Sequence, residues 1–214
     1  MNIKGIVFDM DGVLLDTEKL YVKFWCRAAQ FYGYNMQEFH ALSIRSMARP
    51  FAIEKLKGYF GEDFDYYKVH DKRIELMDKY IEEKGIETKP KAFETLKYLK
   101  EKGLKIALAT ATGIEKTEKY LKMTDLYGFF DKIICASMVK NGKPKPDIYL
   151  KACKELGLLP KECIAVEDSP NGVVSAYDAG LNTIMIPDLD TPDRATKERL
   201  FCICKNLEEL RNYI

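Results

Sequence analysis

The residues best suited to chemistry stand in the segment FDMDGVLLD, which runs from Phe8 to Asp16. Asp9 and Asp11 lie two positions apart directly after an apolar run, so on an extended chain their carboxylates point to the same side. Two carboxylates at close range repel each other. A divalent cation, a shared proton or solvent could relieve that repulsion, and the segment by itself leaves these alternatives open.

Polar side chains also follow other apolar runs of the chain. Thr110, Ala111 and Thr112 come after LKIALA, and Glu167 and Asp168 come after CIAV. Lys143 lies in the loop GKPKPD after KIICAS. Ligands of open parallel sheets bind beyond the carboxyl ends of the strands, so we expect these groups to meet at one edge. A hydroxyl and backbone amides near a helix start, beside an ammonium group, suit a phosphate.

The elements that must position these residues are those of an α/β fold. From Lys91 onward, apolar runs of strand length alternate with segments of helical period, which predicts a Rossmann-like parallel sheet with crossover helices. The first strand, IKGIVFD, is separated from the next by an aromatic-rich stretch with helical spacing. We therefore predict an α/β core domain of residues 1–16 and 89–214, and an inserted α-helical cap domain of residues 17–88.

The composition argues against several classes of partner. The 214 residues carry 34 Lys and Arg against 33 Asp and Glu. The chain therefore has no large net positive charge that would favour binding to nucleic acid or to an anionic membrane. No apolar run approaches the roughly 20 residues that cross a bilayer, and the N-terminal apolar stretch is shorter than a signal-peptide core. We expect a cytoplasmic protein, a monomer, whose six cysteines are reduced core thiols.

Four segments together resemble a known family. FDMDGVLLD, LATAT, GKPKPD and VEDSPNG are similar, in order and in spacing, to the four motifs of the haloacid dehalogenase-like hydrolases. The helical insert resembles the cap of the group that contains β-phosphoglucomutase and small-molecule phosphatases. The resemblance implies that Asp9 attacks phosphorus, that Asp11 is the general acid and base, and that Thr110, Ala111 and Lys143 hold the phosphate.

The same resemblance implies a Mg²⁺ cofactor, which would relieve the repulsion at Asp9. Asp9 and Asp168 would bind the ion, with Glu167 and the backbone carbonyl of Asp11 as further ligands, and Mg²⁺ accepts such oxygen ligands. Asp16 receives a structural or gating role in the flap that leads to the insert.

We predict a Mg²⁺-dependent phosphatase that hydrolyses a small phosphorylated metabolite through a phosphoaspartate. A sugar-phosphate mutase is the alternative, but β-phosphoglucomutases carry a histidine where this chain has Tyr21. A non-catalytic phosphate-sensing or scaffold module is a further alternative. Tyr21, Arg45 and Arg49 in the predicted cap are candidate contacts to the rest of the substrate.

Overall fold

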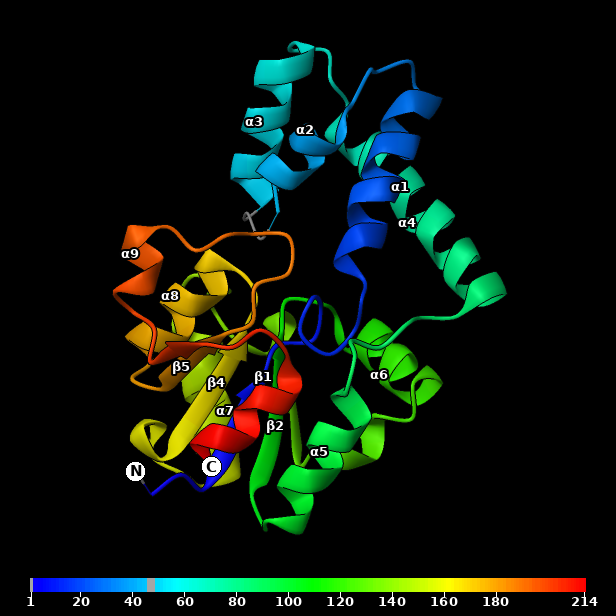
Figure 1. Cartoon of the computed structure of the whole chain (residues 1–214). Coiled ribbons are helices and arrows are strands. Elements are labelled where there is room, and N and C mark those ends of the chain that lie inside the picture. The colour runs from blue at the N-terminus through cyan, green and yellow to red at the C-terminus, as the bar shows by residue number, and fades with distance from the viewer. Residues whose placement is uncertain (1, 46–48) are drawn as a thin grey trace. The chain divides into compact units, whose positions relative to one another are not determined.

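The computed structural model describes residues 2–45 and 49–214, and the chain divides into two compact units. The core unit comprises Met1–Asp16 and Glu87–Ile214, and the helical unit comprises Thr17–Ile86. Figure 1 traces the chain through both.

The core unit is built on a parallel sheet. In the described part of the chain it has six strands, in the order β3-β2-β1-β4-β5-β6, and each neighbouring pair runs parallel. The predicted Rossmann-like α/β fold is thereby confirmed. The strands are β1 (Gly5–Phe8), β2 (Lys105–Thr110), β3 (Lys132–Cys135), β4 (Cys163–Glu167), β5 (Asn182–Met185) and β6 (Cys202–Ile203).

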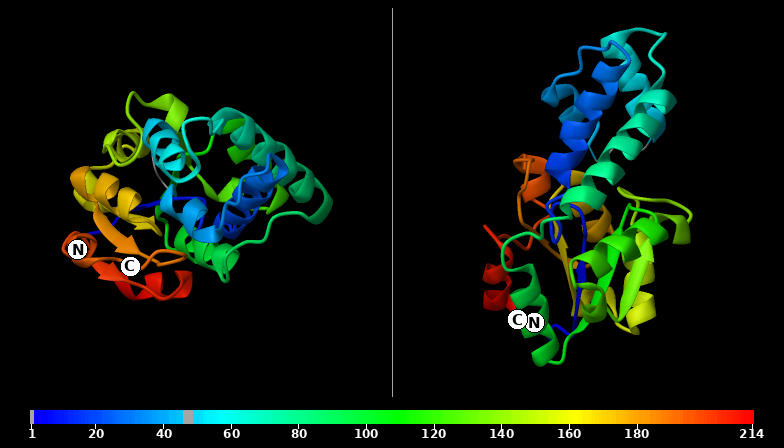
Figure 2. Two further views of the ribbon diagram at one scale, coloured as in Figure 1. Left: turned by 90° about the horizontal axis from the view of Figure 1, so that it is seen from above. Right: turned by 90° about the vertical axis from the view of Figure 1, so that its right-hand side faces the viewer.

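Helices cover both faces of this sheet (Figures 1 and 2). One face packs against α7 and α8, and the other lies against α5 and the C-terminal η4. The helices of the core unit are α5 (Ala92–Glu101), α6 (Ile114–Met123), η1 (Tyr127–Phe129), η2 (Ala136–Met138), α7 (Asp147–Leu156), η3 (Pro160–Glu162), α8 (Pro170–Asp178), α9 (Arg194–Lys197) and η4 (Leu207–Tyr213).

The strands are apolar on both faces because helices cover both. Val7 and Ala107 belong to the hydrophobic cluster on the α7 side, whereas Ile6 and Phe8, which alternate with Val7, point to the other face and are also fully buried. A polar side chain inside such a strand would lose its contact with water. Polar groups are therefore concentrated where the strands end.

The helical unit contains four helices in its described residues: α1 (Glu18–Phe31), α2 (Glu38–Ser43), α3 (Arg49–Phe60) and α4 (Tyr66–Lys84). Trp25 and Ala28 of α1 join Leu56 of α3 and Val69 of α4 in one buried cluster. Nowhere in the described residues is a helix long and apolar enough to cross a membrane.

The two chain segments at which the helical unit leaves and rejoins the core unit pair with each other. Leu15 and Thr88 form an antiparallel bridge. The Lys89 ammonium lies 3.3 Å from Asp16 Oδ1 and 2.7 Å from Asp188 Oδ1. Asp16 therefore contacts the segment that rejoins the core unit, and its structural or gating role stays a prediction.

Asp131 directly precedes β3 and contacts both β2 and α5. Replacing it tests how much these contacts stabilise the core unit. Its Oδ2 accepts the Ile106 amide at 2.7 Å and its Oδ1 accepts Lys100 at 2.9 Å. Partial burial alone would raise the pKa of Asp131, but these donors hold it below its ordinary value. The stabilisation is therefore present above the unfolded pKa and is lost as the pH falls through the lower, folded pKa.

We expect Asp131→Ala to lower the free energy of unfolding at pH 7 by about 1–2 kcal/mol, because the Ile106 amide loses its acceptor. Denaturant titrations of wild type and variant should converge when they are repeated at acidic pH. Glu101→Ala, which removes an exposed acid at the end of α5, is the control and should stay within about 0.5 kcal/mol of wild type. If Asp131→Ala lowered the free energy of unfolding equally at both pH values, the stabilisation would not depend on the negative charge of Asp131.

Candidate active site

The register of the sheet brings the polar strand ends together. Phe8 of β1 is level with Val166 of β4, and the Asp9 amide donates to the Val166 carbonyl at 2.9 Å. Asp9 therefore follows β1 at the same height at which Glu167 ends β4. On the other side of β1, Phe8 is level with Leu108, so Thr110 at the end of β2 reaches the same edge.

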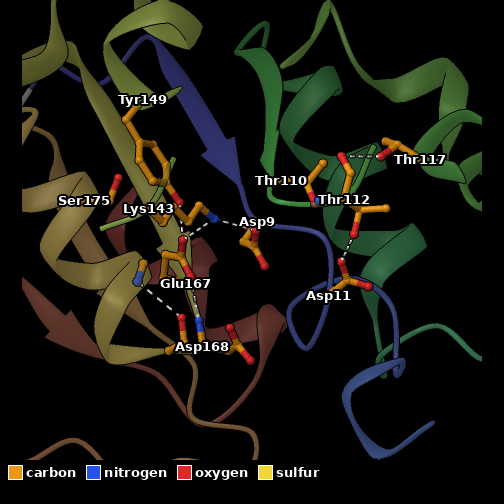
Figure 3. A network of polar contacts seen from close by, with 12 residues as sticks. Asp9, Asp11, Thr110, Thr112, Thr117, Lys143, Tyr149, Glu167, Asp168 and Ser175 are labelled. Carbon is orange, nitrogen blue, oxygen red and sulfur yellow. Dashed lines mark hydrogen bonds and ion pairs between the residues drawn. The ribbon is translucent and has the colours of Figure 1, made fainter. Parts of the chain in front are cut away.

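Asp9, Glu167, Asp168 and Lys143 form a buried acid–lysine cluster at this edge (Figure 3). The Lys143 ammonium lies 2.6 Å from Asp9 Oδ1 and 2.6 Å from Glu167 Oε1. One carboxylate oxygen from each of the three acids lies within 4.8 Å of the others. Residues from β1, β4 and the loop after β3 thus converge as the strand-end pattern predicts.

The electrostatics of the cluster favour additional positive charge. Burial is the largest influence on Asp9 and raises its pKa to about 8; Lys143 lowers that pKa, while Glu167 and Asp11 raise it. Burial alone would lower the pKa of Lys143, but Asp9 and Glu167 raise it above its ordinary value, so the ammonium is charged. One ammonium does not offset three neighbouring carboxylates.

This donor set fits Mg²⁺. Hard oxygen ligands from a few carboxylates are what this ion takes in proteins, and the three acids are all buried. A divalent cation would also balance the charge that Lys143 leaves uncompensated. The side chain of Asp11 is not among these three acids, and the part of its backbone carbonyl in binding the ion stays a prediction.

Asp11 has a different partner from Asp9. Thr112 Oγ1 donates to Asp11 Oδ2 at 2.7 Å, and Figure 3 shows this pair apart from the acid–lysine cluster, on the side of β2 and α6. The two carboxylates therefore occupy different environments although they are two residues apart. The two carboxylates can therefore take different parts in a reaction.

Thr110 ends β2, and Ala111 follows it in the turn. Thr110 is buried at the end of β2, and its Oγ1 accepts the Thr112 amide at 3.0 Å. The turn that follows leads into α6, which begins at Ile114. Hydroxyl and amide groups at this turn are suitable phosphate donors, and their role in binding stays a prediction.

Glu167 is held on several sides. The Tyr149 hydroxyl of α7 donates to Glu167 Oε1 at 2.5 Å, on the same oxygen that Lys143 contacts. Gly172 of α8 lies directly against the carboxylate: a Cβ atom there would come within 2.0 Å of its carbon and of Oε2. Gly172 is therefore needed for space, not for an unusual backbone angle.

The predicted substrate residues Tyr21, Arg45 and Arg49 belong to the helical unit. Arg45 Nε lies 2.9 Å from Glu18 Oε2, and both side chains are largely buried. The Arg73 guanidinium lies 5.0 Å from the centre of the Tyr21 ring. Arg49 is exposed at the start of α3. Their contact with substrate stays a prediction.

Sequence reasoning did not single out Tyr149, Gly172 or Arg73. Tyr149 stands six residues after Lys143, and a hydroxyl on the buried face of α7 could have drawn attention to it. The strand-end pattern does place Thr112 at the polar edge, but nothing in the sequence predicts its hydrogen bond to Asp11. Arg73 is buried beside the Tyr21 and Trp25 rings, and its Nε has no hydrogen-bond partner among the described residues.

Comparisons with known proteins agree with this geometry. Residues 3–180 match the family of haloacid dehalogenase-like hydrolases. A phosphorylated carbohydrates phosphatase from Thermotoga maritima is 33% identical over 188 residues, which cover 85% of this chain and 84% of that protein. Hexitol phosphatase A from Escherichia coli is 31% identical over 197 residues, which cover 90% and 87% of the two chains.

A solved structure is similar over nearly the whole chain. A variant of CbbY from Rhodobacter sphaeroides, in complex with xylulose-(1,5)bisphosphate, superposes with a TM-score of 0.77 at 25% identity. The match covers 97% of this chain and 96% of that one.

Gly172 provides a test of the packing around Glu167. An alanine inside a helix normally stabilises a protein by about 1 kcal/mol relative to glycine. We expect Gly172→Ala to be destabilising instead, because its Cβ would overlap the Glu167 carboxylate. Thermal unfolding should show a lower midpoint than wild type.

Gly58→Ala is the matched control, since Gly58 lies within α3 and a Cβ atom there would meet no described neighbour within 4 Å. It should raise stability or leave it unchanged. If Gly172→Ala behaved like Gly58→Ala, the Glu167 carboxylate would not be confined as described.

Proposed function

Because the chain belongs to the haloacid dehalogenase-like hydrolases, we propose that it is a Mg²⁺-dependent phosphatase that acts on a small phosphorylated metabolite. One observation carries this proposal: Asp9 lies in a buried acid–lysine cluster, while Asp11 is hydrogen-bonded outside it. A nucleophile and a proton donor of the same residue type need such different surroundings.

In the first half-reaction, Asp9 acts as the nucleophile. Lys143 holds Oδ1, and Oδ2 attacks phosphorus with its electron pair. The bond between phosphorus and the ester oxygen breaks, and Asp11 gives its proton to the departing oxygen. The products are the dephosphorylated metabolite and a phosphoaspartate at Asp9.

In the second half-reaction, Asp11 acts as the general base. Its carboxylate takes a proton from water, and the water oxygen attacks phosphorus as the bond to Asp9 breaks. Inorganic phosphate leaves, Asp9 is again a carboxylate, and Asp11 again carries the proton. The Thr112 hydroxyl can hold Asp11 in both states, since a hydroxyl donates to a carboxylate and accepts from an acid.

Asp9, Asp168 and Glu167, with the backbone carbonyl of Asp11, are the residues that would hold Mg²⁺. When bound, the ion supplies positive charge that neutralises the phosphoryl oxygens. Lys143 contributes a second positive charge from the chain itself, and Thr110 and the Ala111 amide are the proposed donors to the remaining phosphate oxygens.

Phosphorylated carbohydrates are the first substrates to test. The Thermotoga maritima relative is named for phosphorylated carbohydrates and the Escherichia coli relative for hexitols. Tyr21, Arg45 and Arg49 are the proposed contacts to the part of the metabolite beyond the phosphate. We propose a monomer that works in the cytoplasm.

Asp9→Asn tests the nucleophile. We expect it to lower phosphate release by at least about a thousandfold, because an amide oxygen of similar shape cannot act as the attacking anion. The measurement is inorganic phosphate released from a panel of sugar phosphates, with Mg²⁺ and with excess chelator. Circular dichroism and thermal unfolding show that the variant is folded.

The panel also separates the alternatives. Wild-type protein that converts one sugar phosphate into another without releasing phosphate would be a mutase. Wild-type protein that binds phosphate esters without turnover would be a sensing or scaffold module. Undiminished turnover by Asp9→Asn, once contaminating phosphatases are excluded, would remove Asp9 from the reaction.

Thr112→Val tests the support of Asp11. A hydrogen bond to a charged group contributes about 1.5–3 kcal/mol, so we expect kcat/KM to fall roughly 10- to 100-fold. Thr112→Ser keeps the hydroxyl and is the control, with activity near wild type. Equal activity of the Val and Ser variants would show that the contact at 2.7 Å has no part in turnover.

A further inference from the structure

Tyr149 is a fully buried tyrosine whose hydroxyl ends at the acid–lysine cluster. Its ring lies in the hydrophobic cluster on the α7 side of the sheet, and the Lys143 ammonium is 5.3 Å from the ring centre. Its hydroxyl is 2.5 Å from Glu167 Oε1. The side chain thus connects the apolar core of the unit to one oxygen of one acid.

The direction of this hydrogen bond follows from the chemistry of the two groups. A carboxylate has no hydrogen to donate, so the phenol must donate to Oε1. Lys143 donates to the same oxygen at 2.6 Å. Two donors occupy the two acceptor directions of Oε1. Oε2 accepts the Asp168 amide at 3.3 Å, so its second acceptor direction is the one that can face a cation or a water bound to it.

The rest of the surroundings limits how Glu167 can turn. Gly172 lies against the carboxylate where any side chain would overlap it. Rotation that moved Oε1 away from Tyr149 would leave a buried phenol hydroxyl without its acceptor, which is unfavourable. The carboxylate is therefore held in one orientation by groups that come from α7, α8 and the loop after β3.

From these contacts we propose that Tyr149 is a positioning residue, which orients Glu167 for metal binding without itself touching metal or substrate. This inference rests on the proposed function, since it assigns Tyr149 a part in the same metal site. Residues that hydrogen-bond to metal ligands typically change metal affinity 10- to 100-fold when they are replaced. Replacing Tyr149 should therefore weaken Mg²⁺ binding to a similar extent.

The test measures Mg²⁺ affinity directly, by calorimetric titration of the full chain with Mg²⁺ alone. Tyr149→Phe removes the hydroxyl and keeps the ring that fills the core. We expect the Mg²⁺ dissociation constant to rise about tenfold or more. Tyr120→Phe is the matched control, because Tyr120 of α6 is also fully buried and the chemical change is the same. Its dissociation constant should equal that of wild type.

A double-mutant cycle tests whether Tyr149 acts through Glu167. In a Glu167→Gln background, adding Tyr149→Phe should weaken Mg²⁺ binding no further, because the acceptor that Tyr149 orients is no longer a charged ligand. A further tenfold loss in that background would overturn the inference. Thermal unfolding without metal accompanies each titration, and Tyr149→Met is measured instead if Tyr149→Phe does not fold.

Two results would separate this inference from the proposed function. If wild type binds Mg²⁺ and releases phosphate while Tyr149→Phe binds Mg²⁺ equally well, the inference is overturned and the proposed function stands. The inference is also overturned if Tyr120→Phe weakens binding as much as Tyr149→Phe. If wild type neither binds Mg²⁺ nor releases phosphate, both are overturned.

Discussion

The arrangement of the site depends on how the core unit accommodates several buried carboxylates at one sheet edge. Asp9, Glu167 and Asp168 are close together and removed from water, which would be strongly unfavourable without compensating positive charge. Lys143 supplies part of that charge through two contacts of 2.6 Å. Burial and the neighbouring acids raise the pKa of Asp9 although Lys143 lowers it, so further positive charge would favour the carboxylate form of Asp9.

The apolar sheet explains why these groups collect where they do. Helices cover both faces of the sheet, and the central strands β1 and β4 carry no charged side chain before their carboxyl ends, where Asp9 and Glu167 stand. The parallel register then sets Asp9 beside Glu167. The crossover helices contribute as well, because α7 provides the Tyr149 hydroxyl and α8 provides the space at Gly172. The same packing that stabilises the sheet therefore also orients the acids.

Much of this could be predicted from local patterns. The alternation of apolar runs and helical segments predicts the parallel sheet, because both periods are properties of short stretches of chain. The strand-end rule then predicts that Asp9, Glu167 and Lys143 meet, since it needs only the order and direction of the strands. The start of α8 is likewise a local feature of the chain: the Ser169 hydroxyl accepts the Gly172 amide at 3.3 Å, and Pro170 is the first helical residue.

The sequence by itself determined the sheet, its polar edge and the residue types available there for phosphate chemistry. Only the tertiary structure decided which partner each group has. Thr112 and Asp11 are 101 positions apart, Tyr149 meets Glu167 across 18, and Arg45 pairs with Glu18 across 27. Such contacts depend on side-chain rotamers and on the distance between packed elements. Local periodicity in the sequence carries no information on either. The environments of Asp9 and Asp11 differ for this reason, although the two residues are almost adjacent in the chain.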